Sequence, residues 1–162
     1  MSSTSPTAAP PGPDKSPGFL LWRVTLRWQR RIAAALRPLA LTHVQFVLLA
    51  TVWWLSDQAD SPARRPSQRE VADHAAVDVM MTSQVLRGLE TRGLVRRALD
   101  PADARVRRLT VTDAGRRLAE LAIAVVEEAD AEFFSIVGTP GQLLEVLHQL
   151  AIDPHPGSTR GR

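Results

Sequence analysis

The stretch from Ser67 to Gly115 constrains the fold more than any other part of this 162-residue chain. It begins with two short helical patterns, and only a few residues separate the first from the second. The second pattern ends near Thr91, and Gly93 follows at the position where helices commonly end in the left-handed conformation. Two short helices joined so closely predict a helix-turn-helix.

A hairpin pattern follows these two helices. The runs 94–98 and 105–111 are typical of strands, and the second run is basic. Asp100-Pro101 lies between them and favours the first two positions of a type I turn. Helix, turn, helix and hairpin in this order predict a winged helix-turn-helix, in which the second helix reads DNA bases and the hairpin is the wing.

The flanking segments predict four further helices. Their apolar spacing and capping residues place them at 19–37, 42–58, 113–136 and 139–151. The helix from Thr42 is apolar nearly all round, which predicts a central, buried helix. In the first helix, Trp22 and Leu26 widen the apolar face, as a dimer interface would require. The predicted fold is mainly α with a small β-wing.

The same patterns divide the chain into parts. Residues 42–112 form the predicted winged helix-turn-helix domain, and the predicted helical segments 18–41 and 113–152 flank it. Residues 1–17 contain five Pro among small polar residues, which indicates a disordered N-terminal arm, and residues 153–162 indicate a flexible tail.

The net charge of +3 hides an asymmetry along the chain. The segment 62–117 has twelve Arg and seven acidic residues, a net charge of +5. The segment 118–153 has seven acidic residues and no Lys or Arg, a net charge of −7. The first segment is therefore suited to a polyanion, whereas the acidic, apolar helices of the second are suited to pairing two chains.

Composition excludes several classes of protein. Cys is absent, which removes disulfides, Cys-based zinc sites and thiol redox sensing. No apolar run is long enough to span a bilayer and no signal-peptide pattern opens the chain, so we expect a cytoplasmic protein. The spacing of His74, His148 and His155 does not indicate a metal site, and we expect no cofactor.

The second helix of the pair carries the predicted base contacts. If Thr82, Leu86 and Leu89 face the core, the outward residues are Met80, Met81, Ser83, Gln84 and Arg87. Gln and Arg form bidentate hydrogen bonds with adenine and guanine, so Gln84 and Arg87 are the expected base readers. The two Met residues suit thymine methyl groups, although one in the core and one on the surface fits equally well.

The wing carries the second set of contacts. Arg105 follows the turn, where its planar cation suits a narrow minor groove, and Asp103 is expected to hold it through an ion pair. Arg107 and Arg108 point to opposite sides of the strand, so only one of them faces DNA; the expected contact is Arg107. The first turn of the preceding helix completes the set with Ser67, Gln68 and Arg69. A solvated, charged hairpin is the alternative.

These motifs resemble the MarR family (multiple antibiotic resistance regulators). The resemblance covers residues 19–151 and is carried by three runs: Leu89-Glu-Thr-Arg-Gly-Leu-Val95, Asp100-Pro-Ala-Asp-Ala-Arg105 and Leu109-Thr-Val-Thr-Asp-Ala-Gly115. It implies a homodimer in which residues 18–41 and 113–152 form the helical dimerisation lobe. It also implies a recognition helix at residues 78–92 and a wing arginine at Arg105. Ala104 departs from the family pattern, because many members have a second Arg there.

The resemblance also implies a ligand pocket between the dimerisation lobe and the winged lobe. The candidates are aromatic or able to bind an anion: Trp22, Arg23, Trp28, His43, Phe46 and Trp53. The alternative is that the aromatic residues belong to the core and that His43 is a surface residue beside a helix cap.

The expected function is that of a homodimeric transcriptional repressor that binds a pseudo-palindromic operator in double-stranded DNA and is released by a small aromatic or anionic effector. The alternative is a ligand-independent DNA-binding activator or architectural factor. An enzyme is disfavoured: Ser67, Asp73 and His74 lie close in sequence, but Ser67 is explained as a helix cap, and the chain has no Gly-rich phosphate loop or nucleophile elbow.

Overall fold

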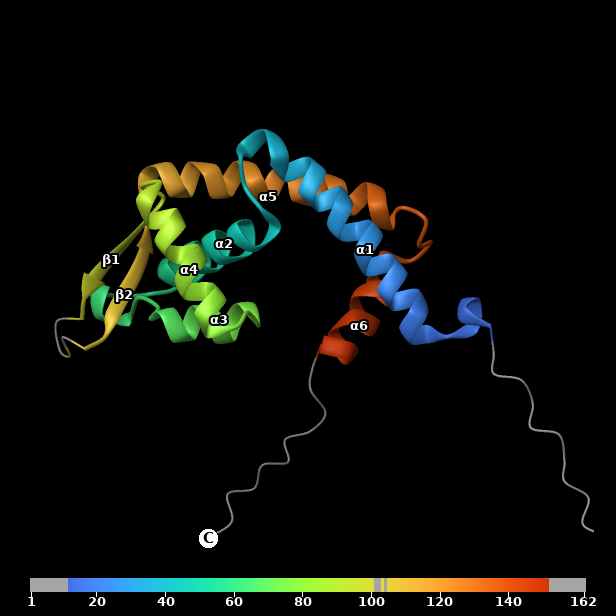
Figure 1. The fold of residues 1–162 in the computed structure, drawn as a ribbon, viewed down its shortest axis with the longest axis horizontal. Coiled ribbons are helices and arrows are strands. Elements are labelled where there is room, and N and C mark those ends of the chain that lie inside the picture. The colour runs from blue at the N-terminus through green and yellow to red at the C-terminus, as the bar shows by residue number, and fades with distance from the viewer. Residues whose placement is uncertain (1–11, 101–102, 104, 152–162) are drawn as a thin grey trace, which may run out of the picture.

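The computed structural model describes residues 12–100, 103 and 105–151, and Figure 1 shows its arrangement. Six α-helices and a two-stranded antiparallel sheet are found in this part of the chain, which confirms the predicted fold class. The α-helices are α1 (Pro17–Leu36), α2 (His43–Asp57), α3 (Gln68–Ala75), α4 (Val79–Thr91), α5 (Asp113–Phe134) and α6 (Pro140–Ala151). The strands are β1 (Val95–Leu99) and β2 (Arg107–Val111), and short 3-10 helices occupy Pro13–Lys15, Arg37–Leu39 and Pro62–Arg64.

The elements form two groups joined by the longest helix. In Figure 1, α2, α3, α4 and the β1–β2 hairpin gather at one end, and α1 and α6 lie toward the other. Helix α5 runs between the two groups and packs along α1. No single helix in the described ranges is long and apolar enough to cross a membrane, although the bent pair Pro17–Leu39 and His43–Asp57 passes that test by length and composition.

Helix α2 is the centre of the core, as predicted. Its buried residues Leu48, Leu49 and Val52 belong to one apolar cluster with Leu86 of α4 and Leu109 of β2. Helix α5 joins the same cluster through Ala119 and Ala122, which lets it pack closely. This core fixes the positions of α3, α4 and the hairpin relative to one another.

Helix starts agree with the predicted capping boxes at Thr42 and Ser67. The Thr42 side chain accepts a hydrogen bond from the backbone N–H of Gln45 at 3.3 Å, and the Gln45 side chain accepts one from Thr42 at 2.9 Å. Ser67 and Glu70 form the same reciprocal pair at the start of α3. Each box satisfies backbone donors that an isolated helix start leaves unpaired.

Two glycines are required where α4, the hairpin and α5 meet. Gly93 has φ 68°, which confirms the left-handed helix end expected after α4. A Cβ on Gly115 would lie 2.0 Å from the carbonyl oxygen of Leu94, so only Gly allows this approach. The same Leu94 carbonyl accepts a hydrogen bond from the backbone N–H of Thr112 at 3.0 Å.

Element boundaries differ from the predictions at several ends. Helix α1 begins at Pro17, within the segment predicted as a disordered arm, because Ser16 caps it and Pro is pre-organised for a first helical turn. Helix α5 ends at Phe134 rather than near Ile136, and the strands begin at Val95 and Arg107. The rest of the predicted arm, residues 1–11, and the tail, residues 152–162, lie outside the described residues.

Candidate nucleic-acid interface

Helix α4 presents two distinct faces. Thr82, Leu86 and Leu89 are fully buried, as predicted from their spacing. The opposite face carries the expected base readers Gln84 and Arg87, both exposed. Asp78 caps the start of the helix, because its carboxylate accepts hydrogen bonds from the backbone N–H groups of Met80 and Met81 at 2.9 and 3.0 Å. A helix fixed in this way offers a polar outer face at a defined orientation.

The two Met residues at the start of α4 both lie on its outer side. Met80 is 70% exposed and Met81 is 49% exposed. The alternative that one of them belongs to the core is therefore wrong. Ser83 lies beside them and is half-buried. An apolar patch thus precedes the polar residues along the same surface.

The first turn of α3 lies beside the hairpin. Ser67 and Gln68 are half-buried and Arg69 is exposed. Ser67 forms an isolated antiparallel bridge with Arg108 of β2, and the carbonyl oxygen of Pro66 accepts a hydrogen bond from the backbone N–H of Leu109 at 2.8 Å. The segment before α3 therefore continues the edge of the two-stranded sheet.

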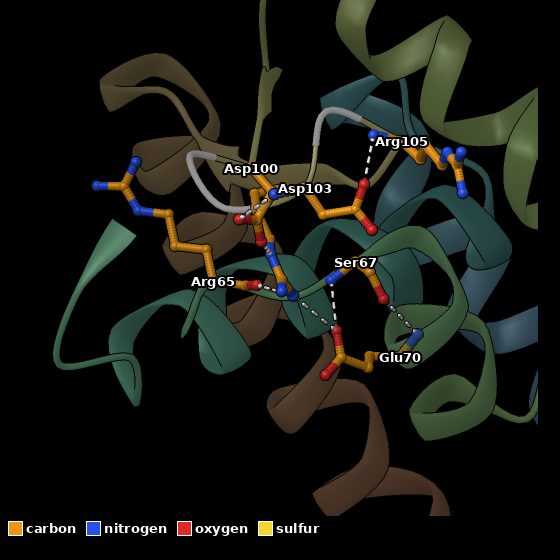
Figure 2. A network of polar contacts seen from close by, with 7 residues as sticks. Arg65, Ser67, Glu70, Asp100, Asp103 and Arg105 are labelled. Carbon is orange, nitrogen blue, oxygen red and sulfur yellow. Dashed lines mark hydrogen bonds and ion pairs between the residues drawn. The ribbon is translucent and has the colours of Figure 1, made fainter. Parts of the chain in front are cut away.

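The hairpin turn holds Arg105 by its backbone. The Asp103 carboxylate accepts a hydrogen bond from the backbone N–H of Arg105 at 2.9 Å, as Figure 2 shows. The expected ion pair with the guanidinium is replaced by this contact, because a carboxylate two residues before an N–H group easily closes a local turn. The Arg105 side chain is exposed.

The side chains of Arg107 and Arg108 point to opposite faces of the hairpin, as their alternation along the strand predicts. Arg107 is exposed, on the same strand end as the turn. Arg108 is only 21% exposed and turns inward: its Nε lies 2.6 Å from Asp100 Oδ2 and its Nη1 lies 3.0 Å from the carbonyl oxygen of Arg65. The structure thus leaves Arg107 as the outward-facing arginine of the two, as expected.

A groove of about 630 Å³ lies between the first turn of α3 and the hairpin. Its lining brings together five of the predicted contact residues, Ser67, Gln68, Arg69, Arg105 and Arg107. Arg97 of β1 also lines it and was missed from the sequence. Arg97 pairs with buried Leu109 across the two strands, so the two side chains lie on the same face of the sheet. The alternation of residues within β1 could have placed Arg97 on that face from the sequence alone. Its Nε lies 3.2 Å from Glu90 Oε2.

Within the described residues of this single chain, the six candidate ligand residues lie in separate places. Trp22 and Arg23 lie on the exposed N-terminal half of α1, and Trp22 is 61% exposed. Trp28, Phe46 and Trp53 all pack against the apolar cluster, in agreement with the core alternative for these three. Trp28, His43 and Trp53 lie in two separate places described below.

Trp28 and His43 meet between α1, α2 and α5. Their rings are 5.0 Å apart in an edge-to-face arrangement, and the Trp28 indole N–H donates a hydrogen bond of 2.6 Å to Asp130. His43 is half-buried rather than a surface residue, and it lines a cavity of about 480 Å³. Burial lowers the pKa of His43, while the nearby Asp130 carboxylate acts in the opposite direction.

Trp53 lines a second cavity, of about 460 Å³, between α2, α3 and α5. Its indole Nε1 is buried and has no hydrogen-bond partner within the described part of the chain. Trp54 and His74 stack at 5.0 Å on the lining of the same cavity. Within the described residues, no group of three or more His, Asp or Glu side chains is placed to hold a metal ion.

No family model matches the chain. The uncharacterized HTH-type transcriptional regulator YdcH of Bacillus subtilis is 36% identical over 86% of this chain and 92% of its own length. The HTH-type transcriptional repressor Rv2887 of Mycobacterium tuberculosis is 38% identical over 80% of this chain and 88% of its own length.

Solved structures have the same fold. The MarR family protein Rv2887 in complex with DNA has a TM-score of 0.64 and 35% identity, covering 86% of this chain and all of that one (100%). CouR of Rhodococcus jostii bound to p-coumaroyl-CoA has a TM-score of 0.72 and 29% identity, covering 87% of this chain and 92% of that one.

Proposed function

The chain belongs to the MarR family of winged helix-turn-helix transcriptional regulators, and we propose that it is a homodimeric repressor of a pseudo-palindromic operator. The observation that carries this proposal is the basic groove between α3 and the wing, next to the exposed outer face of α4. In this proposal α4 enters the major groove, where Gln84 and Arg87 read bases, while Arg105 and Arg107 reach the flanking DNA.

Dimerisation is supported by the apolar surface at the end of the molecule away from the wing. Leu21 and Trp22 of α1 are exposed, and so are Leu144, Leu147 and Leu150 of α6. Apolar side chains gathered in this way are typical of an interaction surface rather than of a monomer surface. We assign residues 18–41 and 113–152 to the dimerisation lobe and residues 42–112 to the DNA-binding domain.

Release by a small molecule is the second part of the proposal. CouR was solved with p-coumaroyl-CoA, and Rv2887 is named a repressor. In this chain the cavity beside Trp53 offers an aromatic lining of Trp53 and Trp54 and a volume of about 460 Å³. These features suit a planar aromatic ligand. The expected cytoplasmic location follows from a role at the chromosome.

Selection of bound duplexes from a random DNA pool tests the first part. A two-fold symmetric site with half-sites about one helical turn apart, roughly 34–36 Å, is the expected result. An enriched site without symmetry, or no enrichment at all, would contradict the operator model.

Operator release tests the second part. The selected duplex is titrated with aromatic acids while its binding is followed by fluorescence anisotropy, and thermal unfolding is measured in parallel. A compound that raises the unfolding midpoint and releases DNA supports the repressor model, and Trp54→Ala, which removes an exposed part of the aromatic lining, should weaken its effect. Unchanged binding with every compound favours the ligand-independent alternative.

A further inference from the structure

Arg108 lies where the wing meets the first turn of α3. Its guanidinium contacts both elements: Nε lies 2.6 Å from Asp100 Oδ2 at the end of β1, and Nη1 lies 3.3 Å from Glu70 Oε2 in α3. Nη1 also donates to the carbonyl oxygen of Arg65, in the segment that precedes α3. One planar side chain therefore links three separate segments, which suits the rigid fork of Arg.

The two carboxylates that bind Arg108 each have a second structural contact. Glu70 accepts a hydrogen bond of 2.7 Å from the backbone N–H of Ser67 and so caps α3. Asp100 is 7% exposed and its Oδ1 lies 3.4 Å from the backbone N of Asp103. Arg108 thus bridges a residue of the α3 capping box and the residue that shapes the wing turn.

The chain of contacts continues to the outermost arginine of the wing. Asp103 accepts the backbone N–H of Arg105 at 2.9 Å, so polar contacts run from Glu70 through Arg108, Asp100 and Asp103 to Arg105. Figure 2 shows this network across the space between the turn and α3. The same two elements form the walls of the basic groove.

Arg108 is poorly suited to contact DNA itself. Its side chain is 21% exposed, and Nε and Nη1 already have acceptors within the protein. The adjacent carboxylates of Asp100 and Glu70 offset its charge, whereas Arg105 and Arg107 are exposed on the same hairpin. The guanidinium of Arg108 is therefore held by contacts within the protein, whereas Arg105 and Arg107 have exposed charges that can meet a phosphate.

We propose that Arg108 is a positioning residue for DNA binding: with Glu70 and Asp100 it fixes the wing to the start of α3, and so sets where Arg105 and Arg107 meet the duplex. This inference rests on the proposed contact between wing and DNA. It adds that the width of the basic groove is set by an ion-pair network that does not touch DNA.

Substitution of Glu70 tests this inference, because two explanations predict opposite changes in DNA affinity. Glu70→Gln removes a negative charge close to the DNA, so electrostatics alone predicts tighter binding. Gln still completes a capping box, so α3 keeps its start. Loss of the Arg108 contact instead predicts weaker binding, roughly threefold or more. Asp73→Asn is the matched control: Asp73 is an exposed acid on the same helix, 3.7 Å from Arg69, and its removal should leave affinity unchanged or raise it.

The experiment measures affinity for the selected duplex at several salt concentrations, using the full chain and its variants. Arg108→Gln should raise the Kd on the order of tenfold, as for the loss of a charge-assisted hydrogen bond, with an unchanged salt slope. Arg108→Lys should weaken binding nearly as much, because an ammonium does not reproduce the planar fork. Arg105→Ala should lower the salt slope by about one.

Hydroxyl-radical footprints locate the change. Arg108→Gln should lose protection beside the wing and keep the protection given by α4. Wild-type affinity in Arg108→Lys, tighter binding in Glu70→Gln, or a salt slope reduced by one in Arg108→Gln would each overturn the positioning role. An unchanged slope in Arg105→Ala would instead refute the wing contact in the proposed function. Thermal unfolding of each variant confirms that it is folded, and Glu70→Gln tests the inference even if Arg108→Gln does not fold.

Discussion

The indole N–H of Trp28 donates a hydrogen bond of 2.6 Å to the carboxylate of Asp130, and this contact joins α1 to α5. Trp28→Phe keeps an aromatic ring beside His43 but leaves the half-buried Asp130 without this donor. We expect the free energy of unfolding to fall by about 1.5–3 kcal/mol, the usual range for a hydrogen bond to a charged group. Denaturant unfolding measures this, with Trp22→Phe as the exposed control; equal losses in both variants would contradict it.

Stability should depend on pH through His43. Burial lowers the pKa of His43 below its usual value of about 6.5, so the unfolded chain binds the proton more readily than the folded one. The stabilising effect of the neutral ring is complete above about pH 6.5 and is lost as the pH falls toward the lowered pKa. In His43→Gln, the thermal unfolding midpoint should change less between pH 7 and about pH 5 than it does in the wild type. The same pH dependence in the variant would assign the effect to another group.

Gly115→Ala should destabilise the protein severely. The added Cβ would lie 2.0 Å from the Leu94 carbonyl oxygen, and backbone on both sides prevents an easy adjustment. We expect a loss of more than about 3 kcal/mol, since α5 or the hairpin must move. Gly88→Ala, in the middle of α4 with open space around it, is the control and should raise or preserve stability. A stable Gly115→Ala protein would show that α5 approaches the hairpin less closely.

Arg87→Ala tests base reading by α4. Arg87 is exposed in the middle of the outer face, and we expect its loss to cost about 1–3 kcal/mol on the selected operator and to relax the preference at one base pair. Competition with single-base operator variants measures both effects. An equal loss on random DNA would instead assign Arg87 to a phosphate.

Much of this architecture follows from local sequence signals. The capping boxes at Thr42 and Ser67, the left-handed Gly93 and the buried face of α4 all depend on neighbours within a few residues, and each matches its prediction. The start of α1 shows the limit of composition: a run rich in Pro indicated disorder, yet Pro17 begins a helix.

The connections between distant segments were beyond the sequence. Arg108 and Glu70 are 38 residues apart in the sequence. Each has oppositely charged residues closer in the sequence, so no spacing rule predicts that these two form an ion pair. The same holds for Trp54 and His74, whose stacking depends on how α3 packs against α2. The ligand candidates lie in separate places in this chain, because helical spacing shows which side chains share a face, but not which faces of different helices meet.

The close approach of Gly115 to Leu94, with the hydrogen bond from Thr112 to the Leu94 carbonyl oxygen, ties the start of α5 to the base of the hairpin. Helix α5 contains 22 residues. At 1.5 Å per residue it is about 33 Å long, so a tilt of about 5° at its far end moves the clamped end by about 3 Å. That distance is close to the rise of one base pair. A small change of tilt among the helices remote from DNA would therefore move the hairpin by about one base-pair step.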